Sequence, residues 1–405
     1  MSLVAAATII EPRRFASVEQ VVETLRPTAP TYVVQPKLLQ AKVTEFLAGF
    51  PGWTLFAVKC NPSTAILDPL YTAGIRDFDV ASLEEVQLIR NRYPDASAYV
   101  MAPFQPVGAY ETAYHEFGIR DFAVDTEDAL NAIFSETKAH DLTIFVRLST
   151  DNDHAMFDLS SKFGADRKTA VRLLRTIAER GAAPALTFHV GSQCEDPDAF
   201  TRAGEICEVV AKEAGVAIQT VDVGGGFPCP YPGSTAPSLD AYFEAISNFR
   251  EKMLFGPSVD LFAEPGRALV AEGVSLLTQV ILHKDNQLYL NDGAYGSFME
   301  RNLEGAKINY PIRVFRENGA GKITEVTGPA VDYTVFGPTC DSCDKLNDPV
   351  TLPAGLKRGD WIEFGMMGAY SNAYASNFNG YLPKNFTIVG DHDEIDAHSG
   401  TVVAL

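Results

Sequence analysis

The chain has 405 residues and a mass of 44.0 kDa, enough for two ordinary domains or for one large barrel with an appendage. Apolar residues make up 46% and charged residues 21%, so a substantial core is expected and wholesale disorder is excluded. The formal charge of −19 disfavours a general binder of nucleic acid or of anionic membranes, because both would repel the chain.

We expect a cytoplasmic protein. No run of 18 apolar residues occurs, so no bilayer-spanning helix is indicated. The first residues lack the basic leader and long apolar stretch of a secretory signal. Six cysteines are ordinary usage for a reducing compartment and are weak evidence for disulfides.

Short apolar, β-branched segments recur eight times in the first two thirds of the chain, and each ends abruptly in polar or glycine residues. Between them lie segments with helical periodicity, of which 83–93 and 167–181 are the clearest. This alternation predicts an α/β protein with a parallel (β/α)₈ TIM barrel; an open doubly wound sheet uses the same units, but the count of eight favours closure. The expected strands are 54–59, 76–82, 97–103, 120–126, 143–149, 185–192, 220–226 and 260–267.

After Arg267 the pattern changes to segments with strand propensity and turn signals, which predict a mostly β region. The strand-like TYVVQ at 31–35 is expected to join it. We therefore predict a barrel over residues 36–267 and a β domain made of 1–35 and 268–405.

Polar residues occupy the carboxyl ends of the expected strands, where a parallel barrel gathers its functional groups. A strand-end arginine alone is usually part of a surface ion pair, and a strand-end histidine alone is usually structural. Several polar strand ends that face the same mouth of a barrel indicate a functional site. The residues at these strand ends are Lys59, Asp79 with Ser82, Arg147, His189 with Ser192, Gly224 to Gly226, and Glu264 with Arg267.

These residue types suggest pyridoxal phosphate as the cofactor. Lys59 follows an apolar strand, and desolvation there would lower its pKa and yield a nucleophilic amine, although a snorkelling lysine is the alternative. The three glycines, with Ser192 and Arg267, offer donors for a phosphate. Glu264 could hold a pyridine nitrogen protonated, and His189 could lie flat on the ring.

Seven motifs then make the chain recognisable: it resembles the fold-type III pyridoxal-phosphate decarboxylases, the group of eukaryotic-type ornithine, lysine and arginine decarboxylases. The motifs are AVKCNP (57–62), FDVAS (78–82), FHVGSQ (188–193), DVGGGFP (222–228), EPGR (264–267), GPTCDSCD (337–344) and GAY with FNGY (368–370, 378–381). The resemblance implies an alanine racemase-like barrel followed by a β domain, and a homodimer with shared active sites.

The resemblance also implies roles for individual residues. Lys59 matches the lysine that forms the Schiff base, His189 the residue that stacks on the ring, and Glu264 the partner of the pyridine nitrogen. Cys340 and Asp341 match residues that come from the other subunit, where the cysteine helps to protonate the decarboxylated carbon and the aspartate grips the distal amine of the substrate. Phosphate-site positions match Ser192, Gly224, Gly225, Gly226, Gly266, Arg267 and Tyr370, and supporting positions match Asp79, Glu85 and Arg147.

The implied reaction is decarboxylation of a basic L-amino acid, with ornithine to putrescine first, lysine or dual ornithine/lysine use second, and arginine third. Asp341 points to a substrate that ends in a simple cation. The family's second carboxylate aligns with Glu304, or with Glu300 after a small gap, and this glutamate departs from the ornithine-type aspartate.

Three other interpretations stay open at this point. An inactive, decarboxylase-like regulatory binder would be expected to lose Lys59, the phosphate glycines or Cys340, all of which are present. An amino-acid racemase would need a tyrosine opposite the lysine and would not be expected to carry the HVGSQ or GPTCDS motifs. The C-x₂-C spacing of Cys340 and Cys343 lacks a second ligand pair, so we expect no metal.

Overall fold

The computed structural model describes residues 14–150, 155–157, 162–252 and 258–390. Eight parallel strands close into a barrel, as predicted, and the closure is made where β12 pairs with β3 and places Ala263 opposite Thr54. The barrel strands are β3 (Trp53–Ala57), β4 (Asp77–Val80), β5 (Ser97–Val100), β6 (Asp121–Val124), β7 (Thr143–Arg147), β9 (Ala183–Thr187), β11 (Thr220–Asp222) and β12 (Asp260–Ala263).

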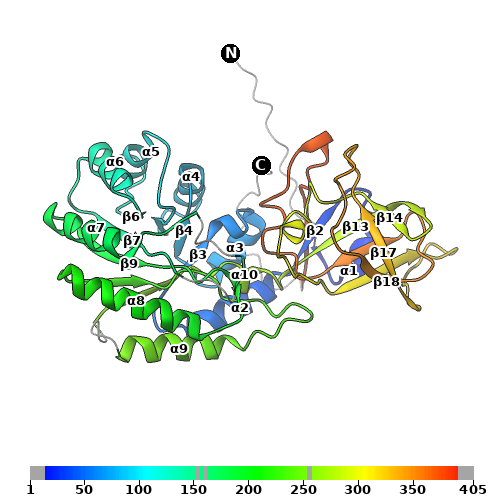
Figure 1. Ribbon diagram of the computed structural model, residues 1–405. Coiled ribbons are helices and arrows are strands. Elements are labelled where there is room, and N and C mark those ends of the chain that lie inside the picture. The colour runs from blue at the N-terminus through cyan, green and yellow to red at the C-terminus, as the bar shows by residue number, and fades with distance from the viewer. Residues whose placement is uncertain (1–13, 151–154, 158–161, 253–257, 391–405) are drawn as a thin grey trace, which may run out of the picture.

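Helices form a ring outside these strands (Figure 1). Polar residues cap the two helices that the sequence indicated most clearly: Ser82 accepts from the N–H of Glu85 at the start of α4, and Asp166 accepts from that of Thr169 at the start of α7. The barrel helices are α2 (Pro36–Gly49), α3 (Thr64–Thr72), α4 (Leu83–Arg92), α5 (Ala109–His115), α6 (Glu127–Thr137), α7 (Arg167–Glu179), α8 (Asp198–Ala214), α9 (Leu239–Lys252) and the short α10 (Arg267–Val270).

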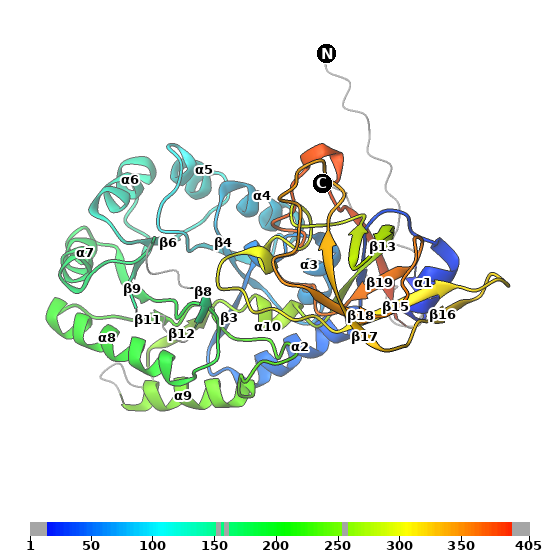
Figure 2. The ribbon, with the colours of Figure 1, turned by 45° about the vertical axis from the view of Figure 1, so that its right-hand side comes forward.

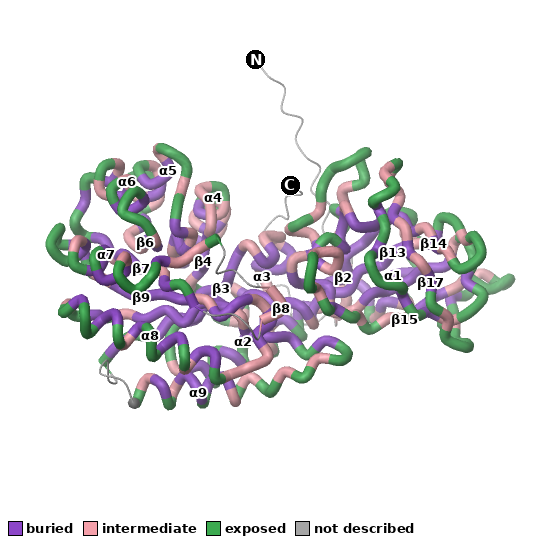
Figure 3. The backbone as a smooth tube through the Cα atoms, in the orientation of Figure 1, coloured by how far each residue is buried: buried purple, intermediate pink, exposed green. Residues whose placement is uncertain are grey.

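Side chains fill the inside of the barrel, which is a packed core rather than a channel. Leu55, Phe145 and Phe262 belong to one buried cluster, in which the rings of Phe145 and Phe262 have centroids 5.9 Å apart. Figure 3 shows buried backbone running through the barrel strands and exposed turns on the outer helices. Polar side chains that could carry a function are therefore expected at the ends of the barrel strands and not inside the barrel.

The second region is a ten-stranded sheet, so the expected mostly β region is present. β2 lies between β13 and β20, which places the segment at 31–34 in this sheet. Its strands are β1 (Arg14–Phe15), β2 (Thr31–Val34), β13 (Val274–Lys284), β14 (Gln287–Leu290), β15 (Ile312–Glu317), β16 (Ile323–Glu325), β17 (Ala330–Phe336), β18 (Val350–Pro353), β19 (Trp361–Phe364) and β20 (Asn385–Val389). The domain boundaries at 35/36 and 267/268 stay a prediction.

Six smaller elements complete the described chain. They are α1 (Val18–Leu25), the two-stranded pair of β8 (Ala155–Phe157) and β10 (Ser192–Cys194), and three 3-10 turns, η1 (Val58–Cys60), η2 (Glu300–Asn302) and η3 (Phe378–Gly380). No helix in the described ranges is both long and apolar enough to cross a membrane.

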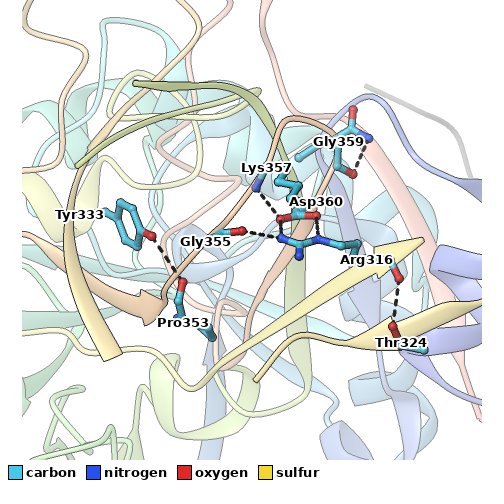
Figure 4. A network of polar contacts seen from close by, with 9 residues as sticks. Arg316, Thr324, Tyr333, Pro353, Gly355, Lys357, Gly359 and Asp360 are labelled. Carbon is cyan, nitrogen blue, oxygen red and sulfur yellow. Dashed lines mark hydrogen bonds and ion pairs between the residues drawn. The ribbon is translucent and has the colours of Figure 1, made fainter. Parts of the chain in front are cut away.

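An ion pair stabilises the β region away from the barrel. Arg316 of β15 donates two hydrogen bonds to Asp360, of 2.7 and 2.6 Å, and the backbone N–H of Lys357 donates to the same carboxylate at 2.7 Å (Figure 4). Asp360 is 2% exposed, so this bidentate pair joins β15 to the turn before β19.

The sheet packs against one side of the barrel, as the turned view also shows (Figure 2). Hydrogen bonds join the segment after β19 to the chain leaving β3: the N–H of Tyr370 donates to the carbonyl of Cys60 at 2.9 Å, and Asn61 Nδ2 donates to the carbonyl of Gly368 at 2.8 Å. These contacts bring a segment of the β region to the end of the strand that leads to Lys59.

Candidate active site at the barrel mouth

Lys59 lies at the mouth of the barrel between two carboxylates. It sits in η1, two residues beyond the end of β3, because the chain turns there and the N–H of Asn61 closes the turn on the carbonyl of Val58. Its Nζ donates a hydrogen bond to Asp79 of β4 and lies 4.0 Å from Oε2 of Glu264, which follows β12. Since β12, β3 and β4 are neighbours in the barrel, strand order alone brings these three predicted residues together.

The charge state of Lys59 differs from the one predicted. Burial lowers the pKa of the ammonium, but the carboxylates of Asp79 and Glu264 outweigh burial and raise the pKa above its ordinary value. The prediction of a depressed pKa was therefore wrong, because it considered the apolar strand before Lys59 and not the carboxylates of neighbouring strands. The amine is therefore held as an ammonium, which Asp79 fixes at the mouth by a hydrogen bond and an ion pair.

Glu264 is a buried carboxyl group beside a second one. Burial raises its pKa well above the ordinary value, and the negative charges of Asp222 and Asp79 raise it further. Asp222, at the end of β11, is fully buried and accepts hydrogen bonds from Thr187 Oγ1 at 2.8 Å and from the N–H of Gly224 at 2.9 Å. Glu264 can therefore retain a proton and share it with a basic atom placed at the mouth.

Asp222 was missed by the sequence analysis. It belongs to the DVGGGFP motif, but no role was assigned to it. The available signal was a polar residue at the end of an apolar strand and directly before the glycines.

His189 presents a neutral ring. Its Nδ1 accepts a hydrogen bond from the N–H of Gly191 at 3.0 Å, which places the ring proton on Nε2. Burial lowers its pKa well below 6.5, and the positive charges of Arg147 and Lys59 lower it further. A neutral, fixed imidazole is suited to packing against a flat ring.

The glycine loop after β11 needs glycine for two reasons. Gly224 and Gly226 have φ values of +67° and +104°, and a Cβ on them would lie 2.1 Å from the carbonyl oxygen of Phe188 and 2.5 Å from that of Gly191. Within the described part of the chain, the N–H groups of Gly225 and Gly226 have no acceptor. The loop thus offers two backbone donors to an anion.

Arg267, the first residue of α10, lies beside this loop and is 3% exposed. Its guanidinium donates to Ser192 Oγ at 3.0 Å and to the hydroxyl of Tyr231 at 3.2 Å, and it forms a bidentate pair with Glu300 at 3.0 and 2.5 Å. Among the described residues, its Nε has no hydrogen-bond partner. Tyr231 was not singled out from the sequence; its position in CPYPG gave no clear signal.

Two further predicted phosphate residues border Arg267. The guanidinium carbon of Arg267 lies 5.0 Å from the centroid of the Tyr370 ring. Gly266 precedes Arg267, and a Cβ there would lie 2.8 Å from the Cβ of Cys60, so the close approach of these two segments requires glycine. The structure thus places Ser192, Arg267, Tyr370 and the glycines in one neighbourhood.

The two remaining supporting residues are Arg147, at the end of β7, and Glu85, in the first turn of α4. Arg147 ends β7 and lies over the ring of Phe163 at 4.8 Å; burial lowers its pKa. Glu85 accepts from the N–H of Ala81 at 2.6 Å, while Ser82 accepts from the N–H of Glu85, an arrangement like a capping box at the start of α4. This cap accounts for Glu85, and its role near a cofactor stays a prediction.

The predicted substrate residues lie in the β region. Asp341 accepts from the hydroxyl of Tyr295 at 2.6 Å and from the N–H of Cys343 at 2.9 Å, and these bonds lower its pKa. Cys340 is exposed. Glu304 is also exposed, whereas the carboxylate of Glu300 is turned to Arg267, which is evidence against Glu300 as the group facing a substrate.

A comparison of the sequence with protein families gives a match over residues 37–271 to the family described as pyridoxal-dependent decarboxylase, pyridoxal binding domain. The chain belongs to this family. It is a pyridoxal-dependent amino-acid decarboxylase of fold type III, as the resemblance implied.

Named relatives of this decarboxylase cover most of its length. Ornithine decarboxylase of Mus musculus is 31% identical over 392 residues, which are 88% of this chain and 80% of that protein. Antizyme inhibitor 2 of Xenopus laevis is 31% identical over 372 residues, 84% of this chain and 76% of that protein. The structure of a lysine/ornithine decarboxylase complexed with cadaverine, from Vibrio vulnificus, matches with a TM-score of 0.78 at 26% identity, covering 93% of this chain and 100% of that one.

Pyridoxal phosphate is the cofactor of this decarboxylase, and the residues at the mouth fit it. Among the residues that the structure describes, the N–H groups of Gly225 and Gly226 and the Nε of buried Arg267 have no partner, so they are donors that a phosphate can satisfy. The amine of Lys59 can react with the aldehyde of the cofactor, and the carboxyl group of Glu264 can share a proton with its ring nitrogen. No cluster of three or more histidine, cysteine, aspartate or glutamate residues that could hold a metal ion occurs in the described ranges.

Proposed function

We propose that this decarboxylase converts L-ornithine to putrescine. The observation that carries the proposal is Lys59 held between Asp79 and Glu264 at the barrel mouth, in a chain that shares 31% identity with the ornithine decarboxylase of Mus musculus. Lysine, alone or together with ornithine, is the second candidate substrate, because the matching Vibrio vulnificus structure is of a lysine/ornithine decarboxylase. Arginine is third.

Pyridoxal phosphate, when bound, supplies an aldehyde that reacts with amines and a ring that accepts the electron pair left by departing carbon dioxide. Asp79 accepts a hydrogen bond from Lys59 Nζ and so orients the amine at the mouth. Glu264 holds a proton at its carboxyl group and can give it to the ring nitrogen, because burial favours its neutral form. Neutral His189 adds no positive charge to the ring it would pack against.

Phosphate would be held by backbone and side-chain donors together. The N–H groups of Gly225 and Gly226, the hydroxyl of Ser192 and the guanidinium of Arg267 all belong to this neighbourhood. Tyr370, whose backbone is bonded to Cys60 next to Lys59, would border it from the β region. Such an anchor would fix the cofactor's orientation relative to Lys59.

The distal amine of the substrate would meet Asp341, supplied by the other subunit of a homodimer. Asp341 is oriented by Tyr295, and its lowered pKa keeps it charged at neutral pH. A carboxylate suits a terminal ammonium through a charge-assisted hydrogen bond. Glu304 is the candidate for a second carboxylate. A cytoplasmic location stays a prediction.

Asp341→Asn is expected to raise the KM for ornithine about 10- to 100-fold and to change kcat less, because the distal ammonium takes no part in bond breaking. Steady-state kinetics on cofactor-saturated protein measure both constants. Asp348→Asn, which makes the same change at an exposed aspartate, is the matched control. A fall in kcat with KM unchanged would contradict this role for Asp341.

Mixing two variants with impaired activity tests the shared site. If the partner subunit's Cys340 completes the site of Lys59, then random reassociation of Lys59→Ala with Cys340→Ala gives half mixed dimers, each with one intact site. Activity is then expected to rise to about a quarter of the wild-type value. Activity that stays at the sum of the two separate residual values would show that each site is built from one chain.

A substrate panel tests the proposal as a whole. Carbon dioxide release from ornithine, lysine, arginine and diaminopimelate is compared by kcat/KM on purified, cofactor-loaded protein. We expect the highest value for ornithine. A higher value for another amino acid would overturn the choice of substrate, and racemisation without carbon dioxide would overturn decarboxylation.

A further inference from the structure

Glu300 places a negative charge inside the predicted phosphate pocket. It is 3% exposed and lies in η2, in the β region, yet its carboxylate reaches the barrel residue Arg267. Oε2 accepts from Nη1 of Arg267 at 3.0 Å, and Oε1 accepts from Nη2 at 2.5 Å. From its position in the sequence, Glu300 was a candidate only for the substrate site.

The surroundings of this ion pair leave the charges of Arg267 and Glu300 weakly screened. Buried Tyr231 accepts a hydrogen bond from Arg267, and the partly buried ring of Tyr310 packs near that of Tyr231 with centroids 6.1 Å apart. Both Arg267 and Glu300 are almost wholly removed from water, so their charges are screened weakly. In this pocket the positive charge of Arg267 is largely offset by Glu300.

A phosphate can enter in two ways, and Glu300 opposes both. If the phosphate takes the place of Glu300 on the guanidinium, a buried carboxylate loses its partner, which is costly. If the pair stays intact, the phosphate binds through Ser192, the glycine N–H groups and Arg267 Nε while a negative charge stands nearby. In either case the affinity for phosphate falls.

We propose that Glu300 is a counter-ion built into the phosphate pocket. It holds the Arg267 guanidinium in position and weakens the binding of phosphate-bearing ligands. Glu300 is thus a positioning residue that acts through Arg267. The proposal rests on pyridoxal phosphate as cofactor and not on which amino acid is decarboxylated.

Binding to the cofactor-free protein tests this inference without turnover. Dissociation constants of pyridoxal phosphate, pyridoxal and inorganic phosphate are measured for the wild type and for Glu300→Gln, which removes the charge and keeps an acceptor for Arg267. We expect pyridoxal phosphate and inorganic phosphate to bind about tenfold more tightly to the variant. Pyridoxal, which lacks the phosphate, is expected to change less than about twofold.

Two outcomes would overturn the inference: an unchanged ratio of the pyridoxal to pyridoxal phosphate constants, or weaker phosphate binding by Glu300→Gln. Glu300→Asp retains the charge and is expected to keep the wild-type preference, which separates charge from volume. Glu179→Gln, at an exposed position of α7, is the matched control. If Glu300→Gln does not fold, Glu300→Met gives the same comparison, because it removes the charge at similar volume.

Discussion

Lys59→Ala is expected to lower kcat for every basic amino acid by about 10⁴-fold or more. The lost amine is the one that stands between Asp79 and Glu264, and alanine leaves neither a nucleophile nor a base in its place. Carbon dioxide release under cofactor-saturating conditions measures the effect. Lys59→Arg, which keeps a cation beside Asp79, is expected to be equally inactive, because a guanidinium cannot be deprotonated in proteins.

Lys42→Ala is the matched control. Lys42 pairs with Glu272 at 3.0 Å and with Glu45 at 3.3 Å, on α2 and its neighbour rather than at the barrel mouth. We expect its kcat to stay within about twofold of the wild type. Near-full activity of Lys59→Ala would end the proposal that Lys59 carries the chemistry.

Glu264→Gln is expected to lower kcat about 10²- to 10³-fold while pyridoxal phosphate stays bound. Glutamine preserves the volume and a hydrogen-bonding oxygen, but it cannot give a proton to the ring nitrogen. The absorbance of bound cofactor reports occupancy, and single-turnover decarboxylation reports the chemical step.

Glu272→Gln is the control for Glu264→Gln, since Glu272 pairs with Lys42 outside the mouth. A kcat of Glu264→Gln within a few-fold of the wild type would show that the ring nitrogen needs no protonated partner. The buried position of Glu264 beside Asp222, and the raised pKa that results, would then have no catalytic consequence.

The barrel was predictable because its strands are short apolar runs with distinct ends. Each of the eight expected segments overlaps one barrel strand, although all the strands end earlier than predicted and β3 and β9 also begin one and two residues earlier. β3 ends at Ala57 and β9 at Thr187, because the chain leaves the hydrogen-bonded ladder where its side chains form the mouth. The pair of β8 and β10 was not foreseen, since segments of three residues carry little periodicity.

The part of the site that depends only on the order of the barrel strands was predictable. Lys59, Asp79 and Glu264 meet because their strands are neighbours. The pair of Arg267 and Glu300 was not predictable in the same way, since its partners come from the barrel and from the β region. The pKa of Lys59 was predicted wrongly for a similar reason: it depends on side chains from other strands.

The inactive regulatory binder is the interpretation that differs most from an enzyme, and an antizyme inhibitor is among the named relatives. Retention of Lys59, the glycine loop and Cys340 favours catalysis. A protein that binds pyridoxal phosphate but releases no carbon dioxide from any amino acid of the panel would favour the binder.

We propose that Lys59 carries the cofactor, and the roles of the other residues at the barrel mouth depend on it. Borohydride reduction of the purified, cofactor-loaded protein, followed by proteolysis and mass spectrometry, tests it most directly, because reduction fixes pyridoxal phosphate on the amine that holds it. We predict a single labelled peptide that contains AVKCNP with the label on Lys59. A label on another lysine, or protein that takes up no label, would contradict the account.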